Sequence, residues 1–63
     1  MELTPLEREC AYWIHRKLRR AGVVHERGVR GVVVGAAMLP EGALSPAQEA
    51  FVLRVQDVLA RSA

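Results

Sequence analysis

The residues best suited to chemistry are the cationic side chains in the first half of the chain. Six Arg and Lys residues fall between Arg16 and Arg30, and Glu26 is the single acidic residue among them. Tyr12 stands four positions before Arg16, so the two side chains share a face if this segment is helical. Guanidinium groups beside an aromatic ring suit contacts with phosphates and stacking on a base or sugar. The pattern predicts a DNA- or RNA-binding surface formed by Arg8, Tyr12, Arg16, Arg19, Arg20, Arg27 and Arg30.

Ordinary helix electrostatics explains part of this basic cluster without any ligand. Cations are stabilised near the carboxyl end of a helix, where they meet the negative end of its dipole. An arginine beside a tyrosine also forms a cation–π pair on its own. Neither effect predicts the continuation of the cluster through His25, Arg27 and Arg30. Only a non-specific or shape-based nucleic-acid contact can be inferred from this cluster, and its affinity is expected to fall as the salt concentration rises.

Cys10 and His15 are the pair most similar to a catalytic nucleophile and its base. On a helix they would lie about 140° apart around the axis, whereas such a pair needs hydrogen-bond distance. Cys10 is expected to be a small core residue instead. The run His25-Glu26-Arg27 is interpreted as the polar flank of a turn. No catalytic residues are predicted, and the chain is expected not to be an enzyme.

Metal and cofactor binding are not expected either. Cys10, His15 and His25 are the only thiol or imidazole ligands in the chain, whereas a closed zinc site usually has four ligands. The glycines of the middle segment match no phosphate-binding or dinucleotide-binding motif. A single cysteine without a secretory leader favours a reducing, cytoplasmic setting. The longest apolar stretch, Gly31–Leu39, is shorter than the roughly 20 residues of a membrane span, so none is expected.

Two helices must position these side chains. Leu3-Thr4-Pro5-Leu6-Glu7 and Leu44-Ser45-Pro46-Ala47-Gln48 each combine a hydroxyl N-cap, proline at the first helical position and Glu or Gln at the third. They predict helices over about residues 5–21 and 46–61, and Gly22 is expected to end the first. Both are amphipathic. The first has an apolar arc of Leu6, Cys10, Ala11, Trp13, Ile14, Leu18 and Ala21, and the second one of Ala47, Phe51, Val52, Val55, Val58 and Leu59.

The middle segment, about residues 23–39, is the part whose structure the sequence specifies least. A helix over 28–39 would place valines and alanines on one face, and Pro40 would end it. Its three interior glycines and four valines cost about 5 kcal/mol relative to alanine. A hairpin with a turn at Arg27-Gly28 agrees with the valine content and with glycine at the second turn position. We therefore expect a β-hairpin at 23–39, with a short helix as the alternative.

The sequence thus predicts one small domain over residues 1–63, of α+β class and mainly α. Its expected architecture is two capped amphipathic helices flanking a Val/Gly-rich β-hairpin. The alternative is an all-α three-helix bundle. A chain of 63 residues buries only about 60% of its unfolded surface, which leaves its stability marginal unless a partner contributes. A homo-oligomer or another protein partner is therefore expected.

The expected function is that of a protein-binding module (a regulator, inhibitor or accessory subunit) that self-associates. Leu53 and Ala60 lie off the main apolar stripe of the second helix and suggest a further contact face. With the apolar middle segment they predict an interface formed by Val29, Val32, Val33, Val34, Leu53 and Ala60. The alternative is a small nucleic-acid-associated protein that uses the basic cluster. A third reading places the first helix on an anionic membrane surface, with Trp13 at the edge of its apolar arc.

Overall fold

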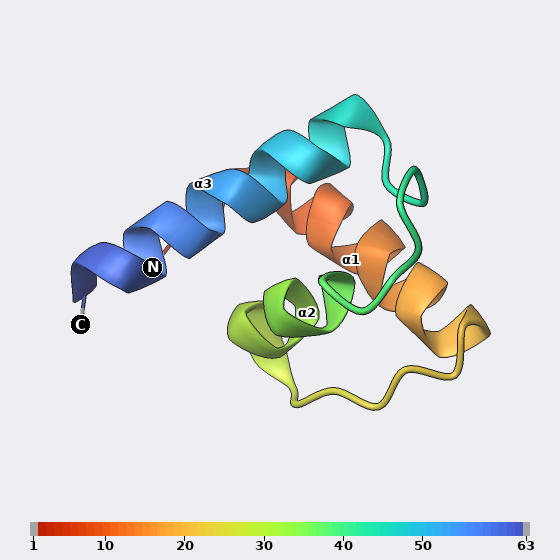
Figure 1. Ribbon diagram of the computed structural model, residues 1–63. Coiled ribbons are helices and arrows are strands. Elements are labelled where there is room, and N and C mark those ends of the chain that lie inside the picture. The colour runs from red at the N-terminus through yellow and green to blue at the C-terminus, as the bar shows by residue number, and fades with distance from the viewer. Residues whose placement is uncertain (1, 63) are drawn as a thin grey trace.

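The architecture is a bundle of three helices, seen in a computed structural model that describes residues 2–62. Helix α1 spans Pro5–Arg20, α2 spans Gly28–Ala36 and α3 spans Pro46–Ser62. Each helix packs against the other two, with the short α2 beside α1 and below α3 in the view of Figure 1. None of residues 2–62 forms a strand. Of these helices, none is both long and apolar enough to cross a membrane.

The β-hairpin predicted for residues 23–39 is wrong, because Gly28–Ala36 form α2. The three-helix bundle, given as the alternative, fits the structure. Packing leaves no room for a side chain at Gly31 and little room at Gly35, two of the glycines that count against a helix. A Cβ atom at Gly31 would collide with the backbone carbonyl of Glu26, and one at Gly35 would lie 3.0 Å from a methyl of Leu18. Tertiary packing therefore overrides the low helix propensity of this segment.

The start of α2 lacks the signals that mark the other two helices. Arg27 is its N-cap residue and makes no side-chain capping hydrogen bond, and the first turn holds no acidic residue. Gly28 has φ of +90°, a conformation that residues with a Cβ rarely adopt. The chain therefore enters α2 through a backbone turn that glycine permits.

The two capping boxes start α1 and α3 as the sequence predicts. The Thr4 hydroxyl accepts from the Glu7 amide at 3.2 Å, and a Glu7 carboxylate oxygen accepts from the Thr4 amide at 2.9 Å. Ser45 and Gln48 make the same reciprocal pair, at 3.2 and 2.9 Å. Both boxes satisfy amides that would otherwise lack helical partners.

Each capping box also binds the other long helix. The second carboxylate oxygen of Glu7 lies 2.7 Å from an Arg54 guanidinium nitrogen of α3. The Gln48 side-chain oxygen accepts from the Lys17 ammonium of α1 at 2.6 Å, and that ammonium also donates to the Ala43 carbonyl at 2.7 Å. Glu7 and Gln48, which are the third residues of α1 and α3, therefore each take part both in a local helix cap and in a contact with the other long helix.

Gly22 ends α1, as expected. Its φ is +72°. The Val23 amide donates to the Leu18 carbonyl at 3.0 Å, and the Gly22 amide to the Arg19 carbonyl at 3.2 Å. This is the Schellman arrangement, in which a residue of positive φ lets the chain satisfy the last carbonyls of a helix. Val23 is half-buried and packs against the core, which completes the motif.

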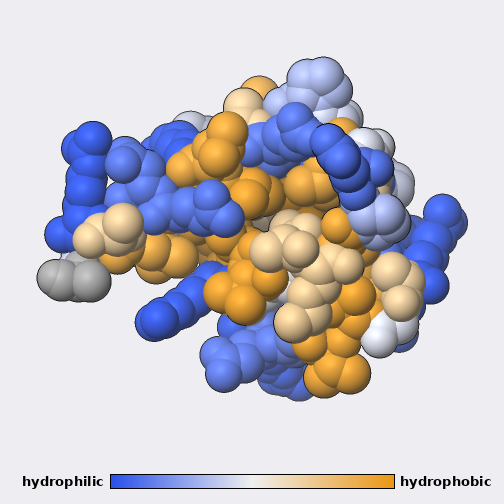
Figure 2. All heavy atoms as spheres, in the orientation of Figure 1, coloured by the Kyte–Doolittle hydropathy of each residue, from blue (hydrophilic) through white to orange (hydrophobic). Residues whose placement is uncertain are grey.

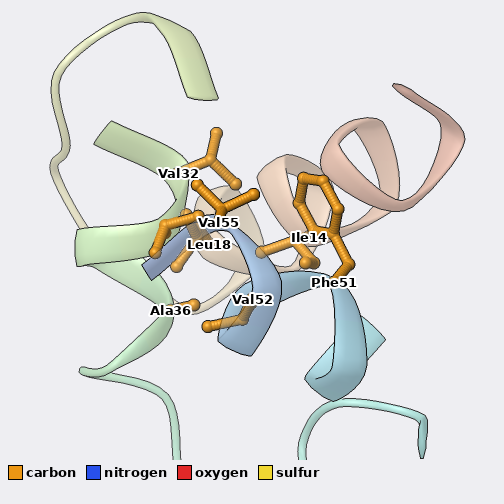
Figure 3. Close-up of a cluster of buried hydrophobic side chains, with 8 residues drawn as sticks. Ile14, Leu18, Val32, Ala36, Phe51, Val52 and Val55 are labelled. Carbon is orange, nitrogen blue, oxygen red and sulfur yellow. The ribbon is translucent and has the colours of Figure 1, made fainter. Parts of the chain in front are cut away.

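The core is formed by aliphatic side chains from all three helices and by one phenylalanine from α3. In Figure 3 they point toward one another from α1, α2 and α3. Its members are Ile14, Leu18, Val32, Val33, Ala36, Phe51, Val52 and Val55. Val32 and Val33, which the sequence assigned to an interface with a partner, are thus core residues.

The apolar arc predicted for the first helix is wider than the face that the fold covers. Ile14 and Leu18 are fully buried, whereas Leu6 is 68% and Trp13 46% exposed. Cys10 and Ala11 are half-buried against the core. The nine-residue α2 and one face of α3 cannot cover an arc of about 160° on α1. The edge of this arc, formed by Leu6 and Trp13, therefore faces outward.

Candidate binding surfaces

A hollow of about 560 Å³ lies beside α2. It is bounded by α2, by the segment before this helix and by Met38, which follows it. Figure 2 shows apolar atoms gathered on this part of the surface, in the lower half of the view. We call it the α2 hollow; its lining residues are Val24, His25, Glu26, Arg30, Gly31, Val34, Gly35 and Met38.

Three large apolar side chains line the α2 hollow and face solvent. Val24 is 94%, Met38 70% and Val34 59% exposed. Gly31 and Gly35 of α2 also line the hollow. The exposed lining of the α2 hollow is polar and apolar in about equal parts, and a concave surface that combines apolar side chains with a few polar groups is typical of a binding site.

Two opposite charges also line the α2 hollow. Glu26 and Arg30 are both exposed, and neither takes part in an ion pair within residues 2–62. A surface that combines apolar side chains with one acidic and one basic group can meet a partner of the same composition. The arrangement is therefore self-complementary in chemistry.

The other interface residues inferred from the sequence are dispersed. Val34 lines the α2 hollow, and Val29 is half-buried against the core. Leu53 is 64% exposed on α3, and Ala60 is exposed on the same helix. Neither of these two residues lines the α2 hollow. Val24 and Met38 were missed, because a segment expected to be a hairpin gave no reason to bring them together.

A second hollow, of about 400 Å³, lies on the outer face of α1. We call it the α1 basic hollow; Tyr12, His15, Arg16, Arg19 and Arg20 line it. All five belong to the last three turns of α1, where spacings of three and four residues bring side chains onto one face.

Arg16 is the best-positioned arginine of the α1 basic hollow. Its guanidinium donates to the Tyr12 hydroxyl at 3.1 Å. The guanidinium carbon lies 5.8 Å from the Tyr12 ring centroid and 5.5 Å from that of Trp13. The two aromatic rings are 5.3 Å apart and nearly perpendicular. These cation–π and edge-to-face contacts hold the aromatic and cationic groups together.

The structure brings together only part of the basic cluster predicted from the sequence. Tyr12, Arg16, Arg19 and Arg20 share the α1 basic hollow. Arg30 lines the α2 hollow instead. Arg8 is exposed on α1 and Arg27 at the start of α2, and neither lines either hollow. His15 completes the α1 basic hollow; the prediction omitted it, although it stands three positions after Tyr12 and four before Arg19.

The two hollows meet at a pair of histidines. His15 of the α1 basic hollow and His25 of the α2 hollow have ring centroids 5.1 Å apart, with planes at 85°. The His25 Nδ1 lies 2.8 Å from the Glu26 carbonyl oxygen. The contact between the two histidine rings therefore holds the segment between α1 and α2 against α1, and it lies at the boundary between the two hollows.

Metal ligands do not gather in the part of the chain that the structure describes. Within residues 2–62, no group of three or more His, Cys, Asp and Glu side chains could hold an ion.

Comparison with known protein families, with curated proteins and with solved structures gives no match to this chain. Function must therefore be inferred from the two hollows themselves.

Proposed function

We propose that this chain is a small non-enzymatic protein-binding module that self-associates through the α2 hollow. The observation that carries the proposal is the exposure of Val24, Val34 and Met38 around one concave surface. Burying these side chains against a second copy would stabilise the assembly through the hydrophobic effect. In this role the chain would act as a regulator, an inhibitor or an accessory subunit.

The solvent-accessible area of the chain is larger than expected for a compact monomer of its mass, which favours a partner that covers part of the surface. A compact monomer of 7.0 kDa is expected to expose about 4,000 Å², whereas this chain exposes 4758 Å². The excess is about 700 Å², close to the roughly 800 Å² that each partner contributes to an interface of standard size. Association of two copies would bring the exposed surface per chain to the ordinary value.

The charges at the edge of the α2 hollow favour a second copy as the occupant. In a two-fold interface, if one residue of the first copy contacts a different residue of the second, the reverse contact also forms. Glu26 of each copy can then meet Arg30 of the other, which forms two equivalent ion pairs. Such pairs fix the orientation of the partners more than they add affinity.

The proposal is tested by sedimentation equilibrium over about a hundredfold range of protein concentration, because self-association depends on concentration. We expect the apparent mass to approach twice 7.0 kDa. Val34→Glu should shift the equilibrium to the monomer. Leu53→Glu is the matched control, because Leu53 is similarly exposed but lies on α3 outside the hollow. A monomeric wild type, or equal effects of the two variants, would refute the proposal.

A charge exchange tests the proposed orientation. Glu26→Arg and Arg30→Glu should each weaken the dimer, because each single variant brings like charges together across the two-fold axis. The double variant restores opposite charges at both contacts and should recover association. Failure of the double variant to recover, with its helical circular dichroism intact, would contradict the Glu26–Arg30 contact.

A further inference from the structure

The α1 basic hollow is a separate surface with a different chemistry from the α2 hollow. Three arginines line it, and no carboxylate is among its lining residues. The two ion pairs within residues 2–62 join Glu7 to Arg54 and Asp57 to Arg61, so Arg16, Arg19 and Arg20 make none. Apart from the Arg16 donor bound to the Tyr12 hydroxyl, their guanidinium groups therefore keep donors that no carboxylate within residues 2–62 uses.

Lys17 is the cation of this helix that the fold itself uses. Its ammonium donates to Ala43 and Gln48 and is half-buried between α1 and α3. The stabilising contacts of the last turns of α1 therefore involve Lys17, whereas the three arginines remain exposed. Helix-dipole stabilisation accounts for cations near the end of α1, but it does not account for an aromatic ring placed among them.

Three guanidinium groups around one hollow suit an anion with several oxygens. Arginine forms paired hydrogen bonds to phosphate oxygens with fixed geometry, more specifically than lysine can. Tyr12 adds a ring that is 53% exposed at the same hollow. A ring of this kind stacks on an unpaired base, and an arginine plane beside it can do the same.

We propose that the α1 basic hollow binds single-stranded nucleic acid. Arg16, Arg19 and Arg20 contact backbone phosphates, and Tyr12 stacks on an adjacent base. An unpaired strand is favoured over a duplex because the bases of a duplex are already stacked on one another. Binding is set by charge and stacking, so it carries little preference for base sequence. It does not depend on the proposed self-association, because the two hollows have no lining residue in common.

The probe is a fluorescently labelled hexathymidylate, a short single strand without defined secondary structure. Anisotropy is measured between about 20 and 200 mM salt. Three phosphate contacts on a single strand predict a logarithmic slope of about −2, which is a loss of affinity of about 100-fold over this range. Arg19→Gln should reduce the slope to about −1.4, because one contact is lost.

Two further variants separate this site from general attraction between opposite charges. Arg61→Gln removes the same charge from α3, where Arg61 pairs with Asp57, and should leave the slope unchanged. Tyr12→Leu should weaken binding by at least about fivefold at constant salt while leaving the slope unchanged, because it removes stacking and no charge. Circular dichroism of each variant verifies that the helices are intact.

Three outcomes would overturn the proposal. The first is that protein well above micromolar concentration fails to bind the oligonucleotide at the lowest salt. The second is that Arg19→Gln and Arg61→Gln change the slope equally, which would indicate non-specific attraction to the whole chain. The third is binding to vesicles of mixed phosphatidylserine and phosphatidylcholine without binding to the oligonucleotide, which would assign the arginines to a membrane surface. None of these outcomes bears on sedimentation of the protein alone, so the two proposals can fail separately.

Discussion

Lys17 and Gln48 join the end of α1 to the beginning of α3, with 2.6 Å between the ammonium nitrogen and the amide oxygen. The same amide oxygen accepts from the Ser45 backbone amide at 2.9 Å. One side chain therefore completes a helix cap and anchors a neighbouring helix. The contacts of this pair lead to the first prediction.

Replacing Lys17 with methionine should destabilise the protein. Methionine keeps the apolar stem but loses the hydrogen bonds to Ala43 and Gln48. Hydrogen bonds that involve a charged group contribute about 1.5–3 kcal/mol each, so we expect a loss at the lower end of that range for this half-buried pair. Urea unfolding followed by circular dichroism measures it. Arg19→Met is the control, because Arg19 is exposed on the same helix; equal losses from both variants would contradict the assigned role of Lys17.

Alanine at Gly31 should be far more harmful than alanine at Gly35. A Cβ at Gly31 meets the rigid backbone carbonyl of Glu26, whereas at Gly35 it makes only tight contacts, with the methyl groups of Leu18 and with the Cβ of His25. The collision at Gly31 should cost a net of about 1–3 kcal/mol. At Gly35 the gain of about 1 kcal/mol in helix propensity should offset most of the strain. Thermal unfolding of the two variants decides the point, and a Gly31→Ala protein as stable as the wild type would show that α2 packs differently.

The stability of the fold should fall in acid through Glu7. A hydrogen bond from the Thr4 backbone amide lowers the pKa of its carboxyl below the ordinary 4.5. Desolvation partly opposes this shift in pKa, while the Thr4 side chain and Arg54 reinforce it. Because the folded pKa is the lower one, the stabilisation is complete above 4.5 and is lost as the pH falls through the folded value.

The acid dependence is measured as Tm against pH for the wild type and for Glu7→Gln. Glutamine can still cap the helix, as Gln48 does in α3, but it does not titrate. The variant should therefore show a smaller loss of Tm in acid than the wild type. Parallel curves would indicate that another carboxyl group dominates the acid response.

Truncating Leu18 to alanine should remove a large part of the stability of the fold. Leu18 is fully buried between helices, and removing such a side chain costs about 2–5 kcal/mol. A domain of this size has a total stability of about 5 kcal/mol or less. Leu53→Ala, at an exposed position of α3, should change stability by less than about 0.5 kcal/mol. Urea unfolding followed by circular dichroism distinguishes the two, and equal losses of stability from both variants would contradict the assigned core.

The sequence predicts α1 and α3 well because their determinants are local. The Thr4 and Ser45 capping boxes and the positive φ of Gly22 each depend on a few consecutive residues. The structure of α2 depends instead on contacts made at a distance. Gly35 admits Leu18 of α1, and Val33 is buried among residues of α1 and α3. A β-hairpin was predicted because intrinsic propensity was the only local signal in that segment.

The candidate surfaces could be predicted only in part for the same reason. Helical spacing along α1 was enough to group Tyr12 with Arg16, Arg19 and Arg20. No local pattern could bring Val24 beside Met38, because the path of the chain through α2 decides that arrangement. The dual role of Gln48 was also hidden, since the sequence shows the cap but not the lysine that approaches it from another helix.

The reciprocal ties between α1 and α3 also determine how the two helices can slide along each other. Glu7, in the first turn of α1, reaches Arg54, and Lys17, near its end, reaches Gln48 at the start of α3. The two helices therefore run in opposite directions and are fastened at two separate levels. A shift of one helical turn, about 5.4 Å, would part both ties at once while leaving valine and leucine stripes able to interdigitate again. The polar contacts thus select a single register among several that apolar packing alone would tolerate.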